Sequence, residues 1–206
     1  MNSSDAPGGG TSPVVPGDRL GDLIRVSGAD ATGRGRSSIE PEYRLDAERT
    51  ICRLATTLAQ VHDVAIEPLA LRVDVEVVRQ PADLVRLAAS SAGEPGPAYR
   101  HMTRDRLLDV LRAGEATAVC NPQDLVLVQG SPTLANLHFD GPDAIGFADW
   151  SGAALGDRYL DLAIAARDVA AVFGPAPVQA FFGEYGLQRP DPVRLDWYLL
   201  AVELVS

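Results

Sequence analysis

Residues 125–163 read LVLVQGSPTLANLHFDGPDAIGFADWSGAALGDRYLDLA, and this stretch decides the fold. Its first four residues are all aliphatic, which predicts a short buried strand. A loop follows over 129–136, and the apolar segments 137–139 and 144–147 then flank Asp-Gly-Pro-Asp, a sequence typical of a hairpin turn. From Arg158 the apolar residues return at helical spacing. The stretch therefore predicts a strand, a loop, a β hairpin and a helix in that order.

Helical periodicity dominates on both sides of this stretch. Upstream, apolar residues recur at helical spacing over 46–62, 82–90 and 103–113. Downstream, one helix is expected to stop at Gly186, and a last helix to begin with Asp191 as its cap. The predicted fold class is α+β and mostly α-helical, with one central β hairpin.

Composition excludes several classes of protein. The chain has 206 residues, of which 28 are acidic and 18 basic, and the net charge of −10 disfavours nucleic acid and anionic membrane as partners. No uninterrupted apolar run reaches the roughly 18 residues of a membrane-spanning helix. Two cysteines are too few for a disulfide scaffold. The first ten residues have neither a basic cluster nor an apolar run, so we expect a cytoplasmic protein rather than a secreted one.

Domain organisation follows from where glycine and serine are concentrated. Residues 1–19 are rich in both and are expected to form a disordered tail. Residues 20–206 are expected to form a single lobe, with a short strand over 20–26. All 18 basic residues are Arg and none is Lys, so any chemistry that requires a Lys ammonium within these residues is excluded.

The spacing of three polar residues carries a resemblance. Asn136 lies five residues after Ser131, and Asp149 lies thirteen residues after Asn136. A strand, a loop ending in Asn, a hairpin and then Asp closely resembles the catalytic core of the aminoglycoside phosphotransferases, whose loop reads His-Gly-Asp, four residues, Asn. The segments 149–163 and 54–62 are also similar to that family, and the resemblance covers roughly 20–206. It implies a protein-kinase-like C-terminal lobe.

The resemblance assigns roles to these positions. In the family, the loop Asp orients or deprotonates the acceptor hydroxyl, while the Asn and the later Asp hold magnesium on ATP. Asn136 and Asp149 are therefore implied to be the ancestral magnesium positions, and Asp161 is implied to brace the loop. An alternative is that Asn136 and Asp149 now only hydrogen-bond the loop and cap backbone groups.

This sequence departs from the family in three places. Ser131 stands where the family has the loop Asp, and a neutral hydroxyl is no carboxylate base. Too few residues precede about residue 23 to build a complete N-terminal ATP lobe, and the Lys that grips phosphate there is absent. We therefore expect kinase chemistry to be lost and ATP not to be a cofactor, with Mg²⁺ as the one metal that Asn136 and Asp149 suit.

The three histidines divide into one structural and two candidate catalytic residues. His62, at the end of the first helix, is expected to bond a neighbouring carbonyl or to cap the helix. His101 lies in a segment expected to border the substrate cleft, and His138 alternates with the apolar residues of the hairpin. Imidazole can transfer protons near neutral pH. Together with Asp149 and Ser131, His138 and His101 are the candidate catalytic residues.

Several functions remain open from the sequence. The favoured hypothesis is a repurposed natural-product tailoring enzyme that promotes cyclisation or elimination on a small molecule or a modified ribosomal peptide. One alternative is a non-catalytic, pseudokinase-like partner of a biosynthetic enzyme or of a second copy of the chain. Another is residual aminoglycoside-type kinase activity that uses a separate ATP lobe.

Overall fold

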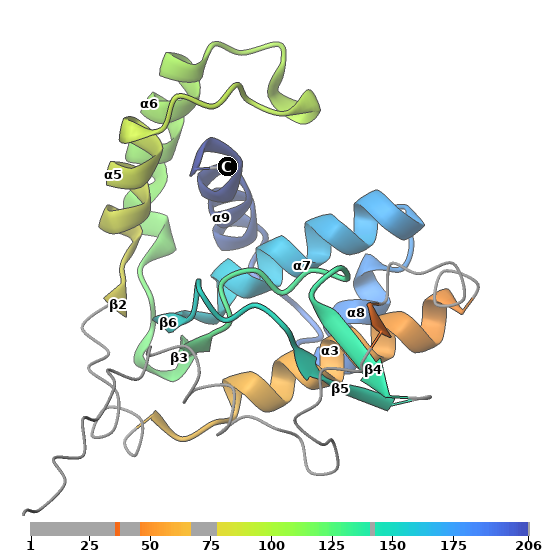
Figure 1. Cartoon of the computed structure of the whole chain (residues 1–206). Helices are drawn as coiled ribbons and strands as arrows, with labels where there is room; N and C mark the ends of the chain where they lie inside the picture. The colour runs from red at the N-terminus through yellow and green to blue at the C-terminus, as the bar shows by residue number, and fades with distance from the viewer. Residues whose placement is uncertain (1–35, 38–45, 67–77, 141–142, 206) are drawn as a thin grey trace, which may run out of the picture.

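The structure, a computed structural model, describes residues 36–37, 46–66, 78–140 and 143–205 (Figure 1). The expected tail over 1–19 and the expected strand over 20–26 lie outside these ranges. Six α-helices are described, and their bounds are α3 Ala47–His62, α5 Pro81–Ser90, α6 Arg104–Gly114, α7 Arg158–Phe173, α8 Val178–Tyr185 and α9 Pro192–Val205. The strands are β1 Arg36–Ser37, β2 Val78–Arg79, β3 Leu125–Val128, β4 Leu137–Asp140, β5 Asp143–Phe147 and β6 Ala154–Asp157.

Helix ends follow the local sequence. Asp46 caps α3, since its Oδ1 accepts from Arg49 N at 3.1 Å. The α7 helix ends at Gly174, and α8 ends at Gly186, where the backbone is left-handed with φ 94°. Asp191 Oδ1 accepts from Val193 N at 2.9 Å, so the expected cap of α9 is confirmed.

The α7 helix forms the centre of the lobe. Nearly all of its first three turns are buried, as expected for a helix that is apolar on every face. One apolar cluster joins α7 to α3, α8 and the β4–β5 hairpin, and a second joins it to α5, α6 and α9. Figure 1 shows α7 lying between these two groups of helices.

Two small sheets flank the 129–136 loop. The first has the order β1-β4-β5 and contains the predicted hairpin, with His138 opposite Gly146. The second has the order β2-β6-β3, and β3 runs antiparallel to β6 from the pair Leu125–Asp157 to the pair Val128–Ala154. The expectation of a single hairpin was incomplete, because Ala-Leu-Gly-Asp has little intrinsic strand preference and becomes a strand through its pairing with β3.

Within the described part of the chain, none of the helices combines the length and the apolar character needed to cross a membrane.

Candidate functional site

Residues 129–136, here called the QGS loop, connect β3 to β4. Carboxylates of α7 accept hydrogen bonds from the backbone of this loop. Asp161 lies in the first turn of α7 and is completely buried. Its carboxylate accepts from Gln129 N at 2.6 Å and from Gly130 N at 2.9 Å. The expected bracing role of Asp161 is therefore confirmed.

A buried histidine orients this carboxylate. His62 Nε2 lies 3.1 Å from Asp161 Oδ2, and His62 Nδ1 lies 2.7 Å from the Tyr185 hydroxyl. A carboxylate only accepts, so Nε2 carries the proton and Nδ1 accepts from Tyr185. Burial raises the pKa of Tyr185 to about 12, which keeps that hydroxyl protonated. The prediction that His62 bonds a nearby carbonyl or caps α3 was wrong, because its partners lie about a hundred residues away in sequence.

A second carboxylate of α7 holds the far half of the QGS loop. Asp168, two helical turns after Asp161 and on the same face, accepts from Leu134 N at 2.6 Å. The sequence analysis missed Asp168. Its spacing of seven residues from Asp161 was the available signal. The α7 carboxylates thus hold both halves of the loop through its backbone amides.

The QGS loop packs directly against residues 148–153, here called the Asp149 loop. Gly130 has φ +91°, and a Cβ there would lie 2.3 Å from Gly152 O, so only glycine fits. The Gln129 side chain bridges the two loops, accepting from Ser131 N at 2.7 Å and donating to Asp149 O. Ala148 N also donates to Asn136 O at 2.9 Å.

These loops bring Ser131, Asn136 and Asp149 into one region. Asn136 Nδ2 donates to Ser131 O at 2.9 Å and lies 3.4 Å from Ser131 Oγ. Asp149 is exposed, and its Oδ1 accepts from Ser151 N at 2.9 Å. That backbone hydrogen bond lowers the pKa of Asp149, so the carboxylate is ionised at neutral pH. The group thus contains one hydroxyl, one amide and one carboxylate.

This donor set fits a magnesium ion in part. The Asn136 amide uses its nitrogen on Ser131 and keeps its oxygen available, and the Asp149 carboxylate is exposed to solvent. Hard oxygen ligands of this kind are those that Mg²⁺ prefers, usually together with substrate phosphates. No cluster of three or more His, Cys, Asp or Glu suited to a metal occurs among the described residues. Asn136 and Asp149 would therefore hold the ion only together with phosphate or water.

The two candidate histidines lie in different parts of the lobe. His138 is half-buried on β4, two residues after Asn136, while the adjacent Leu137 and Phe139 are buried in the core. His101 is exposed in the connection between α5 and α6. In Figure 1 this connection is at the top of the view and the β4–β5 hairpin is at the lower right. His101 and His138 therefore lie on different segments of the lobe, and the position of His101 beside a substrate cleft stays a prediction.

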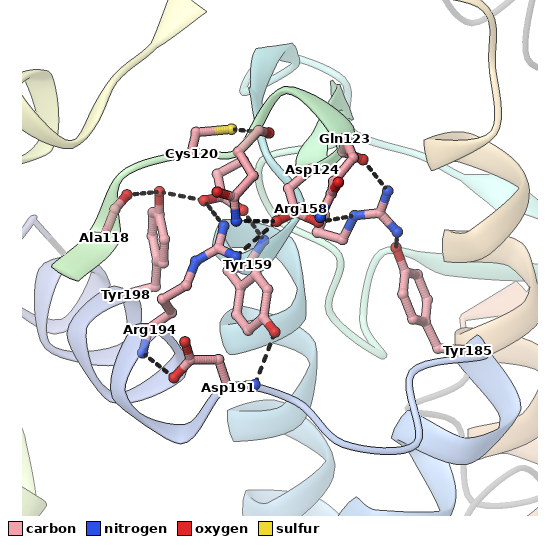
Figure 2. Close-up of polar contacts among 12 residues, drawn as sticks. Ala118, Cys120, Gln123, Asp124, Arg158, Tyr159, Tyr185, Asp191, Arg194 and Tyr198 are labelled. Atoms are coloured by element: carbon pink, nitrogen blue, oxygen red, sulfur yellow. Dashed lines mark hydrogen bonds and ion pairs between the residues drawn. The ribbon is translucent and has the colours of Figure 1, made fainter.

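The opposite end of the β3–β6 pair is an ionic cluster (Figure 2), here called the Arg194 cluster: Asp124, Asp157, Arg158, Arg194 and Tyr198. Arg194 donates to Asp124 at 2.7 Å and to Asp157, and its guanidinium lies 4.1 Å from the centre of the Tyr159 ring. Burial raises the pKa of nearby Cys120 to about 11, so this cysteine stays a thiol.

Comparison with known proteins assigns this arrangement to a family. Residues 20–198 match the phosphotransferase enzyme family. The chain belongs to that family. Aminoglycoside 3'-phosphotransferases from Niallia circulans and Escherichia coli are each 35% identical to it, over 78 and 80 residues. These matches cover 37% and 39% of this chain but only 30% and 29% of the relatives.

Solved structures confirm the phosphotransferase fold. Aminoglycoside phosphotransferase APH(3'')-Id from Streptomyces rimosus superposes with a TM-score of 0.66 at 21% identity, over 80% of this chain and 63% of that one. The chain thus spans less than two thirds of the length of these relatives. The expected protein-kinase-like fold is confirmed.

This phosphotransferase-family lobe has a well-supported loop backbone, while two loop side chains differ from the family motif. In the resemblance stated above, positions 129 and 131 are His and Asp, and here they are Gln129 and Ser131. The buried carboxylates, the close glycine contact and the Asn136–Asp149 pair are all present. The α7 carboxylates bond backbone amides of the loop, so the different side chains at positions 129 and 131 leave these hydrogen bonds in place.

Proposed function

We propose that this chain is a phosphotransferase-fold lobe that binds a divalent cation with phosphate at Asn136 and Asp149 but has lost the activation of an acceptor hydroxyl. The observation that carries the proposal is Ser131. It stands at the loop position where a carboxylate is expected, within a loop whose backbone is otherwise fully supported.

The proposed loss of hydroxyl activation comes from the chemistry of the Ser131 side chain and not from a change in the fold of the loop. Ser131 presents a neutral hydroxyl 3.4 Å from the Asn136 amide, and such a group does not take a proton from an alcohol at neutral pH. General-base assistance contributes about 10²–10⁴-fold in rate. Phosphoryl transfer to an aminoglycoside hydroxyl is therefore expected to be slower by about this factor than with a carboxylate at the same position.

The cation half of the proposal is tested by Mn²⁺ titration, followed by electron paramagnetic resonance, with and without ATP. Asp149→Asn and Asn136→Ala are expected to weaken Mn²⁺ binding at least about tenfold, because the first removes the negative charge of one protein ligand and the second removes the other ligand. Ser131→Ala serves as the matched control in the same loop and is expected to bind like the wild type. Equal Mn²⁺ affinity in wild type and Asp149→Asn would refute this half.

A tailoring enzyme that promotes cyclisation or elimination is a second candidate, favoured by the position of His138. This imidazole is half-buried on the strand that leaves the QGS loop, whereas His62 is engaged by Asp161 and Tyr185 and His101 lies in the connection between α5 and α6. A peptide that carries dehydroalanine and cysteine would report thioether ring closure through loss of free thiol. His138→Ala should abolish closure and His101→Ala should not, and equal closure in both variants would exclude this role.

A further inference from the structure

Gln129 is an uncharged side chain buried at the junction of the two loops. It has no exposed surface, and both ends of its amide are used. Its Oε1 accepts from Ser131 N at 2.7 Å, and its Nε2 donates to Asp149 O. Burying an amide is unfavourable unless it is hydrogen-bonded, so these two bonds account for its presence in the interior.

These bonds connect the two residues whose relative position matters for the proposed function. Ser131 belongs to the QGS loop and Asp149 to the next loop, and the close contact of Gly130 with Gly152 leaves no room for a side chain between the backbones. Backbone contacts and the Gln129 amide join the loops at this end of the site.

We propose that Gln129 is a positioning residue that fixes the backbone carrying the Ser131 hydroxyl relative to the backbone carrying the Asp149 carboxylate. Its backbone amide is fixed by Asp161 at 2.6 Å, so the side chain extends from an anchored point. What the two positioned groups do rests on the function proposed above. The hydrogen-bonded connection itself is independent of that function.

The experiment is amide hydrogen exchange measured by NMR on the full chain, with Gln129→Met as the variant of similar shape that lacks both hydrogen-bonding groups. The Ser131 amide is expected to exchange about tenfold faster, because it loses its acceptor. The Gln129 and Gly130 amides, which Asp161 holds, should keep their protection. Gln179→Met, at an exposed glutamine of α8, is the matched control and should leave the Ser131 amide unchanged.

A second variant covers the case in which Gln129→Met does not fold. In Gln129→His at pH 8, a neutral imidazole supplies one acceptor and one donor, so the Ser131 amide should stay within about threefold of the wild-type rate. An unchanged Ser131 amide in folded Gln129→Met, or a fast one in folded Gln129→His, would overturn the proposal.

Mn²⁺ affinity gives the functional readout and separates the two proposals. If Gln129 positions Asp149 for a cation, Gln129→Met should weaken Mn²⁺ binding several-fold. Wild-type affinity in a Gln129→Met variant with a fast Ser131 amide would overturn the positioning of Asp149. Absence of Mn²⁺ binding by the wild type would refute the function proposed above, while the Ser131 amide would still decide whether Gln129 connects the loops.

Discussion

The two ends of the β3–β6 strand pair are stabilised by different chemistry. At one end, the Arg194 cluster combines buried charges of both signs, and its ionic side chains bond one another. At the other end, carboxylates of α7 hold the backbone of the QGS loop, and the Gln129 amide contacts the Asp149 loop. We therefore expect that Ser131 can change without loss of the backbone hydrogen bonds from α7, whereas a change in the Arg194 cluster destabilises the fold.

The largest effect is expected at the ionic end. Arg194→Met should lower the free energy of unfolding by about 3–5 kcal/mol, because it leaves two carboxylates without their buried partner. Urea denaturation measures this change. Arg112→Met is the control, since Arg112 pairs with Asp109 at 3.6 Å on the surface, and it should cost at most about 1 kcal/mol. Equal losses in both variants would contradict the distinction between the two ends.

The next largest effect is expected at Asp161, the α7 carboxylate that accepts hydrogen bonds from the QGS loop. Asp161→Asn should destabilise the fold by about 2–3 kcal/mol, because an amide group replaces a buried carboxylate that accepts from three donors. Amide exchange at Gln129 and Gly130 should rise in the same variant. Slow exchange at both amides would show that Asp161 does not hold the loop.

The contact between the loops is tested by a pair of glycine variants. Gly130→Ala should cost about 2 kcal/mol or more, because it adds a contact with Gly152 O to the strain of a positive φ. Gly186→Ala has a similar φ of +94° and open space around it, so it should cost about 1 kcal/mol. The difference in midpoint denaturant concentration measures the contact alone, and identical midpoints would mean that the loops can move apart.

A smaller effect with a distinct pH dependence is expected at Tyr185. Burial raises its pKa from 10 to about 12, so only the unfolded chain releases the phenol proton between these values. Titration of Tyr185 should therefore leave the free energy of unfolding independent of pH below pH 10. It should lower that free energy as the pH rises from 10 towards 12. Tyr185→Phe should lower the free energy of unfolding by about 1 kcal/mol at neutral pH. It should also reduce the loss of stability between pH 10 and 12, and urea denaturation measures both effects. An unchanged alkaline decline would contradict the assignment.

Sequence patterns predicted the regular elements well and the long-range pairs poorly. Helical periodicity placed α3, α5 and α6 within a residue or two of their observed ends, and the turn sequence located the β4–β5 hairpin. The β6 strand was missed because its residues prefer no strand and it forms only through pairing.

Only the site residues that are related by a recognisable sequence spacing could be predicted. The spacing of Ser131, Asn136 and Asp149 indicated one site, and the structure places these residues in adjoining loops. The bonds of His62 and Asp168 could not be read from local sequence, because each joins segments that become neighbours only when α7 packs.

The central proposal is that α7 holds the backbone of the QGS loop in place and that the neutral side chain of Ser131 slows phosphoryl transfer. The direct measurement is the rate of transfer from Mg²⁺-ATP to kanamycin by the wild type, Ser131→Asp and the control Ser131→Ala, with the unfolding free energy of each. We predict that all three agree in stability within about 0.5 kcal/mol. We also predict that Ser131→Asp alone raises the rate by about 10²–10⁴-fold. A wild-type rate equal to that of Ser131→Asp would contradict the claim.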